Sequence, residues 1–359
     1  MIADLPVTDV DKNVLDVMES FTLAKVAAAA SQADRDKQLQ PGLLAELDKL
    51  GVFGPSDEAP SPSTQLLLLE TLAGGDAGLA YQLAGEVAAR RLVEAVGRDA
   101  PAGTRYAFAY YEGYGRSPLE LQASASPSAD GGWTLSGTKR AVILPAGTAG
   151  VVLIATVDGQ LAAFLVESSG LAQIAVERDD HIVGRLGIRS AQTGDLSFDR
   201  VIVPAAGLVG SAGSAAVLRE VEWFRLAVAE IALGVARAST RYAVAYAQVR
   251  ESFGQPIISY QGVEFPLVES DMAQDAARLE ILATWSQVEA GGDAARLAQR
   301  VSNAYGVAVA AGVNSTLVGV NSLGGHGYLT DHPVERWYRD ATTLAAFDFD
   351  PLAHSGSIV

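Results

Sequence analysis

The stretch GWTLSGTKRAVIL, residues 132–144, decides the fold class of this sequence. It is rich in β-branched and aromatic residues and is bounded by turn residues, a pattern typical of a strand. Similar short runs surround it, namely YAFAYY (106–111), GVVLIATV (150–157), LAAFLV (161–166) and DLSFDRVIV (195–203). Together these runs predict an antiparallel β-domain of about a hundred residues.

Helical patterns lie on both sides of these strands. Residues 9–51 and 63–98 place apolar residues at helical spacing, and Gly51 stands where a C-terminal cap is expected. From about residue 215 to residue 346 long helical runs resume, with short connections that suit an antiparallel bundle. Helices, then strands, then helices favour an α+β fold over an alternating parallel sheet, and we expect no strand after residue 220.

The three blocks predict three domains. We expect an N-terminal helical domain over residues 1–104, a middle β-domain over residues 105–213 and a C-terminal helical bundle over residues 214–359. A chain of 359 residues is too long for one ordinary core. Because the apolar helices of the C-terminal half exceed what one four-helix bundle hides, we also expect an oligomer.

The composition narrows the classes of function. The net charge is −16, so bulk attraction to nucleic acid or anionic lipid is not expected. Without cysteine, the chain has no disulfide, thiolate metal site or cysteine nucleophile. No two of the four histidines have the spacing of a metal-binding helix, and we predict no metal site. No apolar run reaches the ~20 residues of a membrane span. The acidic N-terminus is unlike a signal peptide, so we expect a cytoplasmic protein.

The segment RESFGQPI (250–257) is followed by Gln261 and Val263. It is similar to the R-x-x-F-G-x-P-I and Q-x-V motifs of the acyl-CoA dehydrogenase family, and two further segments resemble motifs of the same family. GGHGYLTDHPVERWYRDA (324–341) is similar to its GG-x-GY, P-x-x-R and R-D-A. RLGIRSAQTGDLSFDRVIVP (185–204) is similar to its L-G-x-R-x-S stretch and the strand that follows. The three segments occur in the family's order, and weaker similarity extends over almost the whole chain.

The resemblance implies an FAD-dependent enzyme that dehydrogenates an acyl-CoA thioester and passes electrons to an electron-transfer flavoprotein. In homotetrameric relatives, elements like these embrace the ADP end of a flavin that the neighbouring subunit mainly holds. An arginine fork suits phosphate, and glycines let backbone amides approach its oxygens. The cofactor-binding residues that the resemblance implies are Arg250, Phe253, Gln261, Asn321 (where relatives usually have glutamine), Gly324 and Gly325.

The residues expected to meet the flavin ring depart from the family. In AYYEGYGRSP (109–118), Tyr111 replaces a threonine and Pro118 replaces an aspartate. Ala141 stands for the tryptophan that covers the ring, and Ile143 for the threonine whose hydroxyl bonds a flavin nitrogen. Isoleucine has no hydrogen to donate, and alanine leaves the ring face uncovered. The chain therefore resembles a family member that has lost its ring-side contacts.

The catalytic base is a further feature that the resemblance implies. The family's chemistry takes a proton from the carbon next to the thioester, which needs a carboxylate within reach. In most relatives this is a glutamate nine residues after the arginine of R-D-A, and here Asp348 holds that position. Aspartate is one methylene shorter, and the G-T that follows in relatives is absent. Other relatives place the base on the long helix just before an arginine, where this chain has Phe224 before Arg225.

Three functions stay open on the sequence. The first is the degenerate subunit of a heteromeric acyl-CoA dehydrogenase, in which a second acyl-CoA dehydrogenase subunit supplies the ring pocket and the base. Such heterotetramers are familiar among actinobacterial enzymes of steroid catabolism that act on side-chain CoA thioesters. The second is a self-sufficient acyl-CoA or acyl-carrier dehydrogenase that self-associates and uses Asp348 as its base. The third is a non-enzymatic protein of the same fold without flavin.

Overall fold

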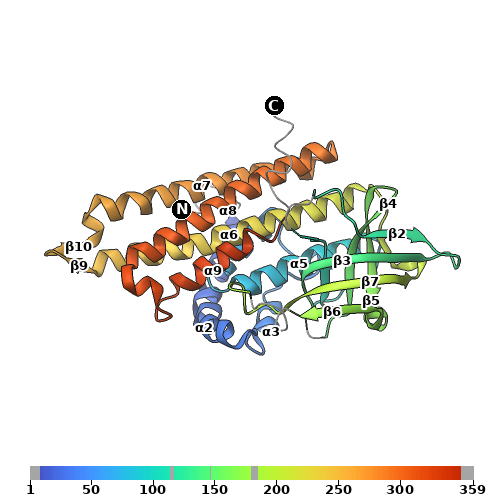
Figure 1. Ribbon diagram of the computed structural model, residues 1–359, viewed down its shortest axis with the longest axis horizontal. Helices are drawn as coiled ribbons and strands as arrows, with labels where there is room; N and C mark the ends of the chain where they lie inside the picture. The colour runs from blue at the N-terminus through green and yellow to red at the C-terminus, as the bar shows by residue number, and fades with distance from the viewer. Residues whose placement is uncertain (1–8, 114–116, 146, 179–184, 349–359) are drawn as a thin grey trace.

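The computed structural model describes residues 9–113, 117–145, 147–178 and 185–348, and the structural statements below concern these residues. Two of the four histidines, His181 and His354, lie outside them. The fold is α+β, as the sequence predicted. Figure 1 shows the sheet at one end of an elongated molecule, with the long C-terminal helices running away from it to the other end.

Two of the N-terminal helices, α4 and α5, pack against the long helix α6. Both begin at side-chain caps: Ser61 Oγ accepts the N–H of Thr64, and Asp76 Oδ1 accepts the N–H of Leu79. A π-helical turn, η2, joins the first two helices. The bounds are α1 (Asp9–Phe21), η2 (Thr22–Val26), α2 (Ala27–Asp36), α3 (Leu43–Asp48), α4 (Pro62–Ala73) and α5 (Ala77–Ala95).

The sheet has eight strands in the order β6-β7-β3-β2-β4-β5-β8, with β1 beside β4. The sequence predicted antiparallel pairing throughout, and this is wrong for two pairs, because β1 and β2 both run parallel to β4. Neighbouring strands joined by a tight turn, such as β4 and β5, pair antiparallel, whereas β1 and β2 reach β4 through longer connections. The bounds are β1 (Tyr106–Ala109), β2 (Ser124–Pro127), β3 (Trp133–Ile143), β4 (Gly150–Val157), β5 (Gln160–Glu167), β6 (Ile174–Arg178), β7 (Thr193–Val203) and β8 (Leu208–Gly210).

The C-terminal part is a helical bundle around α6. Every residue of α6 from Glu220 to Arg237 is buried, as expected of a helix that lies at the centre of a protein. The helix after it begins at Gln261 and contains Pro266. The bounds are α6 (Ala215–Val249), α7 (Gln261–Ala290), α8 (Ala294–Leu323), the short 3-10 turn η7 (Gly324–Tyr328) and α9 (Val334–Leu344).

One element departs from the expectation of helices alone after residue 220. A two-residue hairpin, β9 (Glu251–Ser252) and β10 (Gln255–Pro256), separates α6 from α7. Phe253 and Gly254 form its tip with positive φ values of 51° and 85°. The division into domains at residues 104 and 213 stays a prediction. Among the described helices, α6 included, none combines the length and the apolar character that a bilayer crossing requires.

Candidate functional site

The positions that the resemblance assigned to the flavin ring and the base lie near the contact between the sheet and the helices. Four aromatic rings fill it: Tyr81 from α5, Phe108 from β1, Phe224 from α6, and Phe347 after α9. The ring centroids of Tyr81 and Phe347 are 5.1 Å apart, those of Phe108 and Phe224 5.0 Å, and those of Tyr81 and Phe224 5.8 Å. Tilted and edge-to-face pairs at these distances are favourable. We call this cluster of four rings the seam.

Little space is left in the seam. A cavity of about 10 Å³ remains there, with Tyr81, Phe108, Ala141, Ile143 and Phe224 among the residues that line it. Such a volume holds about one water molecule, whereas ligand pockets commonly have ~300–1,000 Å³. This cavity among the described side chains of the seam is too small for a tricyclic ring or an acyl chain.

The residues that replace the family's ring contacts bond within the chain itself. The hydroxyl of Tyr111 donates to the carbonyl oxygen of Ala346 at 2.8 Å. Ala141 lies at an irregularity in the β3–β7 pairing and has a φ of 53°, and its N–H donates to Asp195 Oδ1 at 3.1 Å. A positive φ in a residue other than glycine, at a β-bulge, often marks a functional position in a fold. At Ala141 the polar partner of the backbone is the carboxylate of Asp195.

Glu112, beside Tyr111, is a buried structural carboxylate. It accepts hydrogen bonds from Lys139 Nζ at 2.8 Å and from the N–H groups of Gln122 and Ala123 at 2.7 and 3.0 Å. Lys139 is fully buried, and this burial lowers its pKa to about 8 although Glu112 acts in the other direction. Both carboxylate oxygens of Glu112 are therefore engaged in holding the loop before β2.

Asp348, the implied base, lies in a buried ion pair. Nε of Arg225 is 3.0 Å from each of its carboxylate oxygens, and Nη2 of Arg225 is 3.0 Å from Oδ2. Arg225 also donates to Glu222 Oε2 at 2.7 Å and to Ser302 Oγ at 2.7 Å. Burial by itself lowers the pKa of Arg225, but Asp348 and Glu222 reverse this, and the net shift is upward. The guanidinium thus stays charged beside Asp348.

Adjacent residues in the two segments face different surroundings. The rings of Phe224 and Phe347 contact Tyr81 in the seam. The side chains of Arg225 and Asp348 contact each other and, through Ser302, α8. The other implied base position is occupied by Phe224, which has no group to accept a proton.

The L-G-x-R-x-S and R-D-A motifs meet each other in the fold. The N–H of Ile188 donates to Asp340 Oδ1 at 2.6 Å, and the N–H of Gly187 donates to Thr343 Oγ1 at 3.0 Å. A Cβ at Gly187 would lie 2.2 Å from the carbonyl oxygen of Arg339, so only glycine allows this approach. Burial raises the pKa of Asp340 to about 7. These motifs fasten α9 to the loop before β7, a role that sequence reasoning missed.

The implied cofactor-binding residues gather at the opposite end of the molecule from the sheet. Figure 1 shows the β9–β10 hairpin at the far end of the helices. Arg250 follows α6, Phe253 forms the hairpin tip and Gln261 begins α7. Asn321 is at the end of α8, and Gly324 and Gly325 follow in η7. The ends of α6 and η7 are joined by a 2.8 Å hydrogen bond between Tyr246 Oη and His326 Nδ1.

These residues are open to solvent. Arg250, Gln261, Asn321, Gly324 and Gly325 are all exposed, and the side chain of Phe253 is 96% exposed. A Cβ built at Gly324 or Gly325 would meet no atom within 4 Å. We call this region the open end. An exposed guanidinium beside uncovered backbone suits the pyrophosphate of an ADP group.

Comparison with known proteins gives consistent matches. The family model described as "Acyl-CoA dehydrogenase, C-terminal domain" matches residues 211–348. The short-chain specific acyl-CoA dehydrogenase of Megasphaera elsdenii is 28% identical over 378 residues, which cover 96% of each chain. The solved butyryl-CoA dehydrogenase from the same organism has a TM-score of 0.84 at 25% identity, over 99% of each chain. A glutaryl-CoA dehydrogenase from Mycobacterium smegmatis, solved in complex with FADH2, shares the fold with a TM-score of 0.82 at 18% identity, over 98% of this chain and 95% of that one.

Proposed function

The chain belongs to the acyl-CoA dehydrogenase family, whose cofactor is FAD, and we propose that it is the degenerate subunit of a heteromeric acyl-CoA dehydrogenase. The assembly dehydrogenates an acyl-CoA thioester between its α and β carbons. This chain supplies contacts to the ADP end of FAD. A second acyl-CoA dehydrogenase subunit supplies the ring pocket and the base, and an electron-transfer flavoprotein takes up the electrons.

The observation that carries the proposal is the contrast between the two ends of the expected FAD site. At the open end, Arg250, Gly324 and Gly325 are exposed and suit an ADP group. In the seam, the described side chains line a cavity of only about 10 Å³, which does not fit the ring end of FAD. Both carboxylate oxygens of Asp348 accept hydrogen bonds from Arg225. We therefore assign no redox step to this chain.

A partner subunit is supported by exposed apolar side chains on α7 and α8. From Val301 to Leu323, α8 has no charged residue, although the whole chain has a net charge of −16. Large apolar side chains on both helices are 40% or more exposed, and those on α7 recur at spacings of three, four and seven residues, which places them on one face. They are Phe265, Val268, Met272 and Leu279 on α7, and Val307 and Leu317 on α8. Apolar faces of this kind usually contact another protein.

We further propose steroid side-chain CoA thioesters as the substrates of the assembly. The support is the alanine-rich, acidic composition, which is typical of the actinobacteria in which such heterotetramers act. An assay of the purified assembly with straight-chain and steroid side-chain CoA thioesters tests this narrower proposal separately from the subunit role.

The subunit role is tested by flavin content. The chain is purified alone and together with an acyl-CoA dehydrogenase encoded next to it, and FAD per chain and molar mass are measured. We expect little FAD on the chain alone and one FAD per heterodimer in the pair. One FAD per chain in the isolated protein, with oxidation of acyl-CoA, would establish a self-sufficient enzyme. Absence of flavin from both preparations would identify the chain as a non-enzymatic protein of the same fold.

Asp348→Asn provides a second test within the assembly. If the partner supplies the base, the rate of the assembled enzyme should change less than about twofold, since asparagine keeps an oxygen that can accept from Arg225. A loss of several orders of magnitude, in an assembly that still forms and still holds FAD, would identify Asp348 as the base.

A further inference from the structure

A large cavity lies between the N-terminal helices and the start of α9, apart from both the seam and the open end. Its volume is about 540 Å³, and segments of α1, η2, α2, α4, α6, α7 and α9 line it. None of the residues that the family resemblance assigned to FAD or to catalysis is among its lining residues. The volume falls within the range of ~300–1,000 Å³ that is usual for small-molecule sites.

Arg336 brings a buried positive charge to this cavity. Its side chain lines the cavity, is 8% exposed, and donates from Nη1 to Ser31 Oγ at 3.1 Å. Within the described parts of the chain, its contacts are this hydrogen bond and the ring of Trp337, whose centroid lies 5.9 Å away, and it forms no ion pair. Asp76 and Asp340 are the acids near enough to interact with it electrostatically, and burial raises the pKa of both. A buried arginine without a carboxylate partner is costly, which favours an anionic ligand.

The other arginines around the cavity already have partners. Nε of Arg278 donates to Glu70 Oε2 at 2.8 Å, and Nε of Arg237 lies 3.3 Å from Glu70 Oε1. At the mouth, Arg241 pairs with Glu19 at 3.2 Å. The charge available to a ligand therefore comes from Arg336, at the end of the cavity beside the N-terminus of α9, where a helix favours negative charge.

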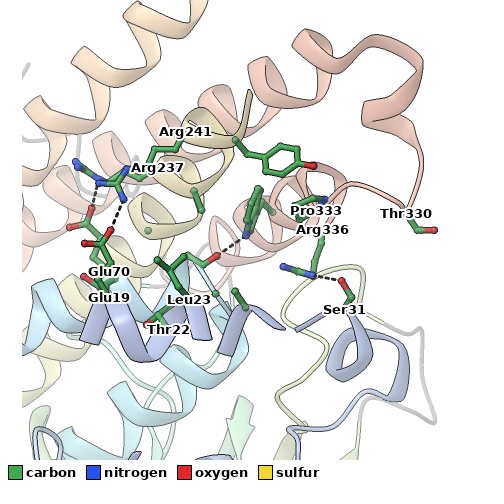
Figure 2. A pocket seen from close by; sticks show the side chains of 18 of the residues that line it. Glu19, Thr22, Leu23, Ser31, Glu70, Arg237, Arg241, Thr330, Pro333 and Arg336 are labelled. Carbon is green, nitrogen blue, oxygen red and sulfur yellow. Dashed lines mark hydrogen bonds and ion pairs between the residues drawn. The ribbon is translucent and has the colours of Figure 1, made fainter. Parts of the chain in front are cut away.

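At the other end of the cavity, Thr22 has a buried hydroxyl that forms no hydrogen bond. Thr22 begins the π-helical turn η2, a type of distortion found frequently at functional sites. The hydroxyl oxygen itself has almost no exposed surface, so a ligand atom reaches it only with a small shift of this turn. A buried hydroxyl without a partner costs about 1–3 kcal/mol, and a hydrogen bond to a polar ligand atom would offset that shift. Figure 2 shows Thr22 on one side of the cavity, and Ser31 joined to Arg336 on the other.

Along the α2 side of the cavity the surface between these two polar ends is apolar, whereas the ion pairs of Glu70 and Glu19 lie on the α4 and α6 side. Leu23, Ala27 and Ser31 recur every four residues, so they form one stripe of the helical run that faces the cavity. Thr22 and Ser31 are nine residues apart, which corresponds to about 13 Å along a helix. The indole of Trp337 forms the facing wall and is held by a 3.1 Å hydrogen bond from Nε1 to the carbonyl oxygen of Gly74.

We propose that this cavity binds an elongated organic monocarboxylate with an apolar body and a hydroxyl or keto group at its far end. Its carboxylate accepts hydrogen bonds from Arg336, its body lies between Ala27 and Trp337, and its distal oxygen meets the hydroxyl of Thr22. A phosphate ester suits the cavity less well, because a single arginine has to balance its second charge and Glu70 and Asp331 also line the walls. The proposal is independent of the subunit role.

The test uses three ten-carbon probes with the full chain, by isothermal titration calorimetry. We expect 10-hydroxydecanoate to bind most tightly, decanoate several-fold more weakly, and 1,10-decanediol about tenfold to a hundredfold more weakly, since the diol lacks the charged group. Equal affinities for the acids and the diol, or no saturable binding of any probe at millimolar concentration, would overturn the proposal.

Two substitutions test the contacts at the two ends of the cavity, a third fills its middle, and a fourth is a control. Thr22→Val should abolish the preference for 10-hydroxydecanoate over decanoate while making the ligand-free chain no less stable, because valine has the same shape and no unpaired oxygen. Arg336→Gln should abolish the preference for decanoate over the diol. Ala27→Leu fills the middle of the cavity and should lower the affinity for all three probes. This variant keeps the proposal testable if Arg336→Gln does not fold. Lys25→Gln removes a positive charge from the same π-turn outside the cavity and should leave all affinities within about twofold. Preferences that persist in Thr22→Val and Arg336→Gln would refute the assigned contacts.

Discussion

The seam and the open end contain the same types of residue but differ in how far the side chains are exposed to solvent. Phe224 in the seam is 5% exposed, whereas Phe253 at the open end is 96% exposed. Arg225, which follows Phe224 but lies outside the seam, is buried between two carboxylates, whereas Arg250 is exposed. The side chains of the seam contact other side chains of the same chain, so they stabilise the fold. Those of the open end contribute little to the fold, which leaves them available to another molecule.

This difference separates two kinds of resemblance to the family. A motif at the open end retains residues that the chain does not need for its own stability. In the seam, the family's positions are occupied by side chains that fill the space and satisfy each other, such as Tyr111 with Ala346. Matched substitutions in the two regions should therefore have opposite consequences for stability and for FAD.

The largest effect is expected from the two arginines. Arg225→Ala leaves Asp348 and Glu222 buried without their common partner, and the free energy of unfolding should fall by about 3–5 kcal/mol. Arg250→Ala should change it by less than about 0.5 kcal/mol, as is usual for exposed positions. Urea denaturation of both variants measures the difference.

The same pair of variants separates the regions by their effect on FAD. In the assembly with its partner, Arg250→Ala should weaken FAD retention about tenfold or more, because a charge-assisted contact to phosphate is lost. FAD occupancy is followed over a dilution series. Unchanged occupancy in Arg250→Ala would mean that the open end is not an ADP site.

The next effect concerns packing. Phe224→Ala removes a ring that contacts both Tyr81 and Phe108, and should lower the free energy of unfolding by about 3–4 kcal/mol. Phe253→Ala, the same change at the open end, should be nearly neutral. Thermal and urea unfolding of the two variants provide the measurement. Similar losses in both would contradict the division into a filled seam and an uncovered end.

A smaller, pH-dependent effect on the free energy of unfolding is expected from Asp340, which joins α9 to the loop before β7. Burial raises the pKa of Asp340 to about 7 in the folded chain, above its usual value near 3.8. Its stabilising contribution is therefore complete below pH ~4 and is lost as the pH rises through 7. Asp340→Asn removes this dependence, so from pH 4 to pH 8 the native chain should lose about 2–4 kcal/mol relative to the variant. Urea denaturation of both proteins at several pH values tests this, and a constant difference would refute the shift.

Local patterns were sufficient to predict most of the fold. The β-branched content of strands such as β4, and the long helical runs of α6 and α8, are properties of contiguous sequence. The parallel pairing of β1 with β4 was missed because it depends on a crossover and not on either strand. The β9–β10 hairpin was missed because two residues carry no periodicity.

The candidate site was predictable only where it consists of one or two segments. The residues of the open end could be grouped from the sequence because Arg250 and Phe253 belong to one motif and Gly324 and Gly325 to another, and their role as an ADP site stays a prediction. The filling of the seam depends on four rings from distant segments, and the cavity beside Arg336 depends on the packing of the N-terminal helices against α9. No spacing within the sequence contains that information.

The smallest effect is expected at the tip of the hairpin, where Phe253 combines an exposed ring with a φ of 51°. A left-handed backbone costs a residue other than glycine about 1–2 kcal/mol, and no contact within the described chain offsets it by burying the ring. Such strain at a functional site is usually compensated by an interaction elsewhere. Phe253→Gly should relieve it and raise the free energy of unfolding of the isolated chain by about 0.5–1 kcal/mol, after allowing for the greater entropy of glycine in the unfolded state. Phe253→Ala keeps the strain and should show no gain. In the assembly, both variants should lose FAD more readily and to the same extent, because both lack the ring. A stabilised Phe253→Gly that retains FAD as well as the native chain would show that the ring does not contact the cofactor.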